Sequence, residues 1–174
     1  MMRVIHIILV CAVFMLAACS DGNKSGTATS SGQKLAAKDI SLATLKLRNL
    51  DGSELDVATL AGKRVFVNFW ATWCKPCLAE MPSIERATEL LAAKNVVMLA
   101  ASDEKLDRIS KFKDKNSYSF NIVATEADLG VLEIFALPTT FIFDEQGKLV
   151  FKETGAREWD SPESIKLINE TNKL

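Results

Sequence analysis

The stretch that decides the fold runs from residue 64 to residue 77 and reads Arg-Val-Phe-Val-Asn-Phe-Trp-Ala-Thr-Trp-Cys-Lys-Pro-Cys. Its first seven residues are β-branched, aromatic and nearly all apolar, which is typical of a central strand covered on both faces. From Pro76 to about Lys94 the apolar residues recur on one helical face, so this segment predicts a helix. Cys74 and Cys77 therefore stand where a buried strand turns into a helix.

This placement gives the two sulfur atoms different chemistry. Cys74 is expected at the helix N-terminus, where unpaired N–H groups and the helix dipole favour an anion. Lys75 adds a neighbouring cation, so the pKa of the Cys74 thiol should fall below its usual value of about 8.5. Cys77 comes one turn later and faces inward. An exposed Cys74 thiolate can attack a partner's disulfide, after which the inner Cys77 thiol resolves the mixed disulfide.

Three other roles compete for the cysteine pair. A purely structural disulfide across so short a loop would constrain little of the unfolded chain. A zinc site needs about four ligands. The single histidine, His6, lies in an N-terminal segment that we expect to be removed, so the mature chain offers this cysteine pair and no histidine. A copper(I) carrier remains open as the alternative to thiol–disulfide exchange, because two thiolates suit that ion.

The rest of the chain alternates between strand and helix patterns. Strands are expected at residues 95–101, 120–124, 139–143 and 148–152, and helices at residues 104–115 and 127–135 and from Ser161 onward. Ser161 has the residue type of an N-cap, with Pro162 at the first helical position. Before the cysteines, residues 44–49 and 54–57 flank Asp51-Gly52, a turn signal that predicts an N-terminal β-hairpin. The alternation indicates an α/β layer sandwich closed at one edge by a hairpin.

The first 38 residues have a different composition. Arg3 is followed by an apolar run to Ala18, which is short for a membrane-spanning helix of about 20 residues and is typical of a signal peptide. The run ends in Leu16-Ala17-Ala18-Cys19, which resembles a bacterial lipobox. We therefore expect residues 1–18 to be removed and Cys19 to carry lipid, with an ordinary cleaved signal as the alternative. Residues 19–38 then form a flexible tether rich in Ser, Thr and Gly, and residues 39–174 the folded domain.

Charge and histidine content exclude several classes of function. The 174 residues include 21 basic and 22 acidic side chains, and this balance argues against a general nucleic-acid binder. His6 leaves with the expected signal peptide, so a general acid or base must be a carboxylate or water. Glu80 lies three positions after Cys77 on the same helical face. Burial would raise its pKa and let it exchange a proton with Cys77, whereas a solvated helix glutamate is the plain alternative.

Two motifs carry a resemblance to a known family. Phe69-Trp70-Ala71-Thr72-Trp73-Cys74-Lys75-Pro76-Cys77 resembles the active-site segment of the thioredoxin superfamily, and Leu78-Ala79-Glu80-Met81-Pro82 resembles its membrane-tethered TlpA/ResA/DsbE-like branch. The likeness extends to Leu137-Pro138-Thr139-Thr140-Phe141-Ile142-Phe143-Asp144 and covers roughly residues 42–174. It implies a thioredoxin-like α/β fold, in which a central mixed β-sheet is flanked by helices.

The resemblance also implies roles for individual residues. The proline that matches Pro138 is cis and packs beside the two sulfurs, and the residue before it, Leu137, contacts the backbone of the bound partner. A trans proline that starts a strand is the alternative. The family carries a functional glutamate at the position of Glu80. Asn68 departs from ordinary thioredoxins, which have a buried aspartate there, so proton handling passes to Glu80 or water. Trp73 is expected to shield the site.

The activity implied by the resemblance is that of an extracytoplasmic thiol–disulfide oxidoreductase without a cofactor or metal. Lys75-Pro76 favours the reducing direction, because strong oxidants of the superfamily typically carry a histidine between the cysteines. Envelope proteins with disulfides, apocytochrome c among them, would be the clients, and a membrane donor of the thioredoxin-reducing type would supply electrons. We expect a monomer anchored through Cys19 in the bacterial envelope and facing the periplasm, with Ser20 favouring the outer membrane. A peroxidase of the peroxiredoxin type is disfavoured, because Ala71 stands where that mechanism has threonine.

Overall fold

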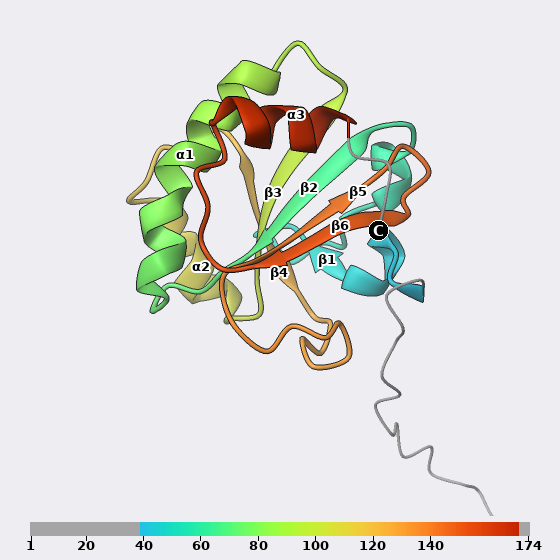
Figure 1. Ribbon diagram of the computed structural model, residues 1–174. Coiled ribbons are helices and arrows are strands. Elements are labelled where there is room, and N and C mark those ends of the chain that lie inside the picture. The colour runs from blue at the N-terminus through green and yellow to red at the C-terminus, as the bar shows by residue number, and fades with distance from the viewer. Residues whose placement is uncertain (1–38, 171–174) are drawn as a thin grey trace, which may run out of the picture. The chain divides into compact units, whose positions relative to one another are not determined.

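The computed structural model describes residues 39–170, which form a six-stranded sheet with α-helices packed against it (Figure 1). The expected signal peptide, tether and lipidated Cys19 lie outside the described residues. The strands are β1 (Leu47–Arg48), β2 (Arg64–Phe69), β3 (Val96–Ser102), β4 (Asn121–Thr125), β5 (Thr139–Phe143) and β6 (Leu149–Thr154). The α-helices are α1 (Lys75–Leu91), α2 (Leu106–Lys113) and α3 (Pro162–Glu170), and the short 3-10 helices η2 (Leu42–Leu45) and η3 (Val57–Leu60) precede β2. Within the described range, no helix combines the length and the apolarity that a membrane crossing requires.

The strand expected before the cysteines, β2, lies inside the sheet, whose order is β1-β4-β3-β2-β5-β6. It runs parallel to β3, with Asn68 opposite Ala100, and antiparallel to β5, with Phe69 opposite Thr139. All of its residues are buried, as the apolar pattern predicted. The expected mixed sheet is confirmed, and the β5–β6 hairpin forms one edge of it.

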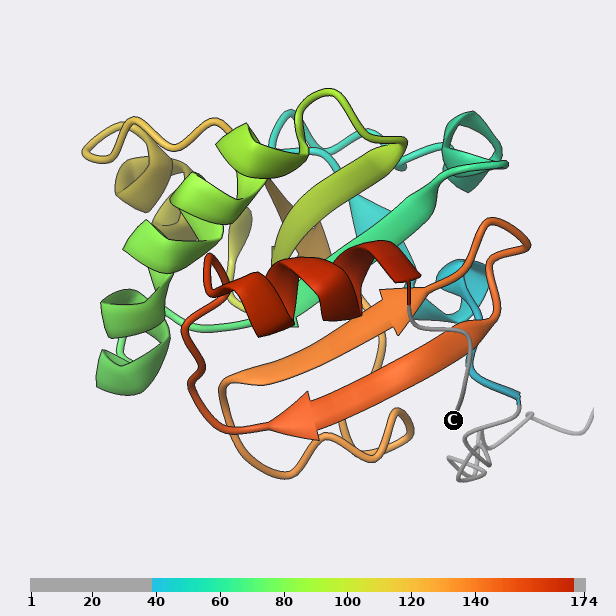
Figure 2. The ribbon, with the colours of Figure 1, turned by 45° about the horizontal axis from the view of Figure 1, so that its top comes forward.

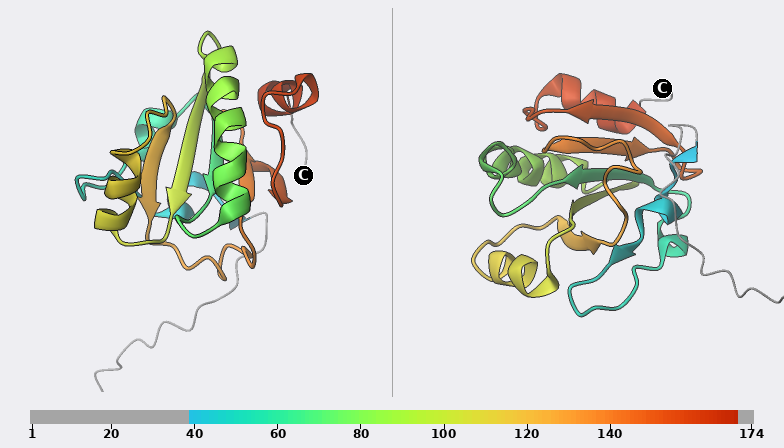
Figure 3. Two further views of the ribbon diagram at one scale, coloured as in Figure 1. Left: turned by 90° about the vertical axis from the view of Figure 1, so that its left-hand side faces the viewer. Right: turned by 90° about the horizontal axis from the view of Figure 1, so that it is seen from below.

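The two faces of the sheet are covered by different structures. On one face, all three helices contribute to a hydrophobic cluster, with Met81, Ile109 and Ile168 as buried members, and Figure 2 shows α1 and α3 lying across this face. On the other face, the cluster takes Leu45 from the N-terminal segment and Leu132 from the loop before β5. Figure 3 (right) shows the N-terminal segment, in blue, on the side of the sheet opposite α1 and α2. The α-helices therefore gather on the face where α1 brings the cysteines.

The helices begin and end close to their expected positions. The inward residues of α1, among them Cys77 and Met81, have no exposed surface. At the start of α3, the Ser161 hydroxyl oxygen accepts a hydrogen bond from the Ser164 N–H at 3.2 Å, which is the interaction of a helix N-cap. The sequence pattern thus located the helices of the helical face correctly.

The expected N-terminal β-hairpin is not confirmed. Its turn forms, with Gly52 in the left-handed region at a φ of 87°, but the two arms meet only at a bridge between Arg48 and Glu54. Lys46 also has a left-handed φ, 45°, which ends η2 just before β1. Asp56 caps η3 and so ends the second arm. Because both arms are cut short, the two residues of β1 find their ladder partner in β4 instead.

Residues 127–135 do not form the expected helix. They make tight turns, in which the Ile134 N–H donates to the Leu129 carbonyl at 2.8 Å and Glu133 takes a left-handed φ of 57°. Leu132 and Ile134 are buried in the cluster on the face opposite the α-helices. The segment expected to be helical therefore covers the sheet with irregular backbone.

Candidate active site

The two cysteines stand at the N-terminus of α1 and are joined by a disulfide. Cys74 is the N-cap, and its Sγ accepts a hydrogen bond from the Cys77 N–H at 3.3 Å. Pro76 lies in the first turn, where a helix has no partner for an N–H donor. Cys77 is fully buried, whereas Cys74 is 4% exposed. Both cysteines are thus buried with the disulfide formed, and Cys74, expected to be exposed, is only the less buried of the two. Cys74 stands at a helix end, which stabilises a thiolate.

The side chains beside the disulfide differ sharply in exposure. Trp73 is 68% exposed, and Lys75 and Pro76 also face solvent. Trp73 was expected to shield the disulfide. Because most of its surface is exposed to solvent, this role stays a prediction. Trp70, by contrast, is buried and packs against Phe112, with 4.5 Å between the ring centroids. Trp70 thus belongs to the core beneath the loop that carries the cysteines.

The Leu137–Pro138 peptide bond is cis, as the resemblance implied. Pro138 directly precedes β5, whose first residue, Thr139, pairs with Phe69 at the end of β2. The loop to the cysteines and the loop that ends in the cis-proline therefore meet the sheet at the same end. The Gly155 N–H donates to the Pro138 carbonyl at 2.8 Å, whereas the backbone of Leu137 makes no hydrogen bond within residues 39–170. A residue whose backbone groups are unpaired among the described residues thus adjoins the cis-proline.

Glu80 lies one helical turn after Cys77 and is buried, with 4% of its surface exposed. Its Oε1 accepts a hydrogen bond from Asn68 Nδ2 at 2.8 Å. Its Oε2 accepts two, from the backbone N–H of Arg157 and from the indole Nε1 of Trp159, both at 3.0 Å. These two donors lie 77 and 79 positions away along the chain. The carboxyl group is therefore held between α1, β2 and the connection from β6 to α3.

Burial raises the pKa of Glu80 above its ordinary value of 4.5. The hydrogen bonds from Arg157, Asn68 and Trp159 favour the carboxylate and lower the pKa, but the loss of hydration outweighs them, and the carboxylate of Glu153 adds a further increase. Glu153 in turn pairs with the Arg157 guanidinium at 2.7 Å. A carboxyl group in this environment accepts and releases a proton closer to neutral pH than a solvated glutamate does.

Asn68 links Glu80 to the neighbouring strand. Its Nδ2 also donates to the Thr140 hydroxyl oxygen at 3.0 Å. Its Oδ1 is buried and has no hydrogen-bond partner among the described residues, a situation that costs about 1–3 kcal/mol of stability. Because an asparagine does not ionise, proton uptake at this point of the core falls to Glu80.

Glu104, which follows β3, anchors the loop before the cysteines and was missed by the sequence reasoning. Its carboxylate accepts hydrogen bonds from the Thr72 N–H at 2.6 Å and the Thr72 hydroxyl at 2.9 Å, and it pairs with Arg108 at 3.1 Å. Burial alone would raise the pKa of Glu104, but these contacts outweigh it and lower the pKa. One signal was available: the carboxyl ends of parallel neighbouring strands lie side by side, so an acidic residue just after β3 must lie near the loop after β2.

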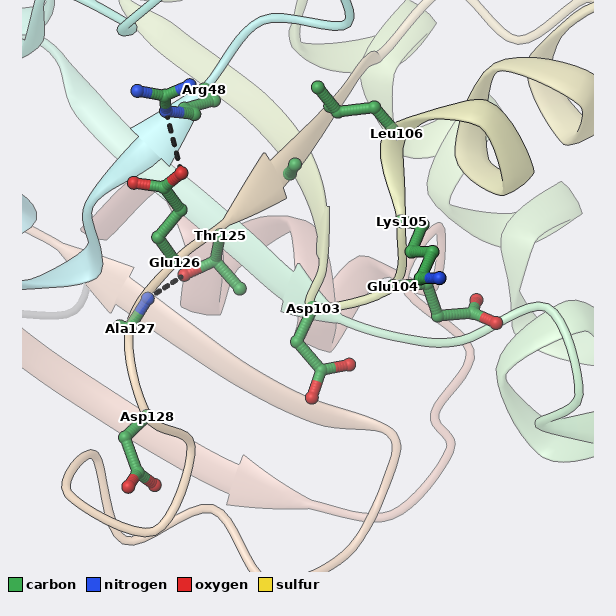
Figure 4. A pocket seen from close by; sticks show the side chains of 10 residues that line it. Arg48, Asp103, Glu104, Lys105, Leu106, Thr125, Glu126, Ala127 and Asp128 are labelled. Carbon is green, nitrogen blue, oxygen red and sulfur yellow. Dashed lines mark hydrogen bonds and ion pairs between the residues drawn. The ribbon is translucent and has the colours of Figure 1, made fainter. Parts of the chain in front are cut away.

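A pocket of about 460 Å³ opens at the same end of the sheet (Figure 4). It is lined by residues that follow β3 and β4, Glu104 among them, and by Arg48, which pairs with Glu126 at 3.0 Å. Within residues 39–170, no group of three or more His, Cys, Asp or Glu side chains is placed to hold a metal ion. Neither cysteine lines the pocket, which is therefore separate from the disulfide.

Comparison with known proteins adds a family and several relatives. A model of the AhpC/TSA family matches residues 35–152, more than half of the chain. The thiol-disulfide oxidoreductase ResA of Geobacillus thermodenitrificans is 37% identical over 107 residues, which are 59% of this chain and 61% of that protein. The ResA of Bacillus subtilis is 28% identical over 147 residues, 82% of each chain. The chain thus spans about three fifths of the length of the Geobacillus relative and more of the Bacillus one.

Solved structures share the fold. A thiol:disulfide interchange protein of the thioredoxin family from Chlorobium tepidum superposes with a TM-score of 0.56, over 70% of this chain and 90% of that one, at 23% identity. StoA from Bacillus subtilis gives the same TM-score over 71% of this chain and 94% of its own, at 21% identity. At this level of identity the likeness establishes the fold, which is thioredoxin-like as the sequence implied.

Proposed function

The chain belongs to the AhpC/TSA family, and we propose that within it this protein is an extracytoplasmic thiol–disulfide oxidoreductase that reduces disulfides in envelope proteins. One observation carries the proposal: the Cys74–Cys77 disulfide at the N-terminus of α1, with Cys74 as the N-cap and the less buried of the two cysteines. The names of the ResA relatives support the same activity.

The reaction follows from the positions of the two sulfurs. In the reduced chain, the Cys74 thiolate attacks a client disulfide; a bond forms between Cys74 and one client sulfur, and the other leaves as a thiolate. Cys77 then gives its thiol proton to Glu80 and attacks Cys74. The Cys74–Cys77 disulfide forms, the second client sulfur leaves, and the client has gained two electrons. The disulfide in the structure corresponds to the product of this sequence.

The unpaired backbone of Leu137 supports a way to hold the client. A peptide that lies beside this residue can form strand-like hydrogen bonds with its free N–H and carbonyl groups. Because the loops to Leu137 and to the cysteines meet the sheet at the same end, such a peptide would place its own disulfide near Cys74. We infer that Leu137 and Pro138 bind the client backbone.

The cellular setting of the proposal comes from the sequence. Lys75-Pro76 between the cysteines favours the reducing direction, so the oxidised protein needs a membrane electron donor of the thioredoxin-reducing type. Apocytochrome c is the client class we infer. A lipid on Cys19 would anchor a monomer in the bacterial envelope, facing the periplasm, with Ser20 favouring the outer membrane.

The lipid anchor is tested by labelling cells with radioactive fatty acid. Loss of the label from Cys19→Ser, with labelling kept in Cys11→Ser, would support the anchor, and unchanged labelling of Cys19→Ser would refute it.

The activity is tested by insulin reduction and by trapping. We expect the full-length chain to reduce insulin with dithiothreitol as electron source, and Cys77→Ser to accumulate mixed disulfides with envelope proteins. The matched control is Cys74→Ser, which keeps the buried Cys77 and should trap no partner. Tight stoichiometric copper(I) binding with negligible insulin reduction would instead favour the carrier function. Consumption of hydrogen peroxide without insulin reduction would favour a peroxidase, which Ala71 disfavours.

A further inference from the structure

The two oxygens of the Glu80 carboxyl group differ in what surrounds them. Oε2 receives hydrogen bonds from the Arg157 backbone N–H and the Trp159 indole N–H. Both groups are donors only, and neither becomes an acceptor by rotation. A proton on Oε2 would compete with these two donors for the lone pairs of that oxygen and displace at least one of the hydrogen bonds. Protonation of Glu80 is therefore favoured at Oε1.

Oε1 also faces a donor in this structure, because Asn68 Nδ2 lies 2.8 Å away. A side-chain amide, however, carries a donor at one end and an acceptor at the other, and rotation about its last torsion angle exchanges them. After such a rotation, Asn68 Oδ1 would accept a hydrogen bond from a protonated Oε1. Asn68 thus has a hydrogen bond to offer to either protonation state of Glu80.

The surroundings of Asn68 allow this rotation. Its Oδ1 has no partner among the described residues, so no fixed donor holds the amide in its present orientation. Its second contact is the Thr140 hydroxyl at 3.0 Å, which accepts from Nδ2 now and can donate to Oδ1 after the turn. One amide atom stays unpaired in both orientations, so they differ mainly in the hydrogen bond to Glu80.

We propose that Asn68 is a positioning residue whose side-chain amide turns over when Glu80 binds a proton, so that the carboxyl group keeps a hydrogen bond in both states. The inference rests on the proposed function in one respect, the use of Glu80 as acceptor of the Cys77 proton. It explains why a non-ionising residue with an unpaired oxygen occupies this buried site. A buried aspartate there would compete with Glu80 for the proton, whereas the amide follows it.

Other charged groups face Glu80 and enter its titration. Glu153 on β6 disfavours the Glu80 carboxylate, and the Arg157 guanidinium pairs with Glu153 at 2.7 Å. Neither contacts Asn68 through a hydrogen bond. A charge effect from these groups would shift the midpoint of the Glu80 titration without turning the Asn68 amide, so the orientation of the amide is the decisive observation.

The experiment is a solution NMR titration of the reduced full-length chain, with Asn and Glu side chains labelled with ¹³C and ¹⁵N. Where Glu80 is ionised, we expect a scalar coupling across the hydrogen bond from Asn68 Nδ2 to Glu80 Cδ. Where Glu80 is protonated, the coupling should vanish, and Asn68 Cγ should shift with the same midpoint as Glu80 Cδ. A coupling that persists in both states, an Asn68 Cγ that does not titrate, or a Glu80 that keeps one protonation state from pH 4 to pH 9 would overturn the proposal.

A kinetic measurement complements the titration. Asn68→Leu keeps the branched shape of the side chain and removes both its donor and its acceptor, so we expect client release from the mixed disulfide to slow about tenfold, with its pH midpoint moved upward. Val67→Ala, next along β2 on the opposite face, should leave that midpoint unchanged. An Asn68→Leu variant with the rate and midpoint of the unsubstituted chain would contradict the proposal. The NMR titration needs no client, so absence of insulin reduction would refute the activity and leave the amide test standing.

Discussion

The two faces of β2 belong to the same six residues and yet are built for different purposes. On one face, Val65, Val67 and Phe69 are fully buried among apolar side chains of β3, β5 and the N-terminal segment. On the other, Asn68 lies between the apolar Phe66 and the loop to the cysteines, and contacts the buried carboxyl of Glu80. An apolar side chain in place of Asn68 would avoid an unpaired buried oxygen. The first face maintains the fold, whereas the face with Asn68 carries an unpaired buried oxygen beside the carboxyl group proposed to accept the Cys77 proton.

The largest effect on stability is expected on the apolar face. Phe141 is fully buried and meets Phe69 edge-to-face, with 5.0 Å between ring centroids. Phe141→Ala should lower the free energy of unfolding by about 3–5 kcal/mol, because it leaves a cavity. Urea denaturation measures the loss, and the reduction potential of the folded fraction should stay the same. A changed potential would show that this face also takes part in the redox chemistry.

On the helical face, Glu80→Gln should act on the rate more than on the fold. The amide keeps an oxygen for the Arg157 and Trp159 donors but accepts no proton, so resolution of the mixed disulfide should slow about a hundredfold. Stopped-flow release of a fluorescent client thiol measures this step. A rate equal to that of the unsubstituted chain would show that water, rather than Glu80, takes the Cys77 proton.

The same variant should change how stability depends on pH. Because the folded-state pKa of Glu80 is raised above 4.5, the folded chain binds more protons than the unfolded chain between these two values. The contribution of Glu80 to stability is then fully present below about pH 4.5 and declines as the pH rises through the raised pKa. Glu80→Gln should remove this decline in urea titrations from pH 4 to pH 8, and an unchanged slope would contradict the raised pKa.

A smaller effect is expected at Glu104, which holds the loop before the cysteines. Glu104→Ala removes the carboxylate that accepts hydrogen bonds from the backbone N–H and the hydroxyl of Thr72. We expect the free energy of unfolding to fall by about 1–3 kcal/mol. Since the pKa of Glu104 is lowered, its contribution is present above about pH 4.5 and is lost as the pH falls through the lowered value. Equal losses at pH 7 and pH 3 in chemical denaturation would argue against this anchoring role.

The smallest effect is expected away from both faces. Leu90 on α1 is 60% exposed, so Leu90→Ser should change the free energy of unfolding by no more than about 0.5 kcal/mol and leave client reduction unchanged. This variant is the control for exposed apolar side chains. A marked loss of client reduction would reveal a contact surface at the far end of α1.

The sequence predicted best what depends on local pattern. The buried run of β2, the capped start of α3 and the strands β5 and β6 all rest on neighbours in the chain, and the structure places them as expected. It failed where tertiary contacts decide. Residues 127–135 were expected to form a helix, but Leu132 and Ile134 are buried in the cluster on the face opposite the α-helices, and this packing favours turns there.

The site was predicted in the same uneven way. Cys74, Cys77 and the buried position of Glu80 follow from helical spacing, and the cis bond at Pro138 was implied by resemblance alone. The donors that hold Glu80 were not foreseen. Arg157 and Trp159 lie 77 and 79 positions beyond it, in a connection without periodicity, so only the packing of α3 on the sheet brings them to the carboxyl group.

The most direct test of the central claim, that the Cys74–Cys77 pair reduces disulfides, is an equilibrium redox titration of the full-length chain. Trp73 adjoins Cys74, so its fluorescence should report oxidation in buffers of defined potential. We predict a two-electron transition with a midpoint near or below about −270 mV, the value for thioredoxin. A midpoint near about −120 mV, typical of a strong oxidant, would contradict the reducing direction.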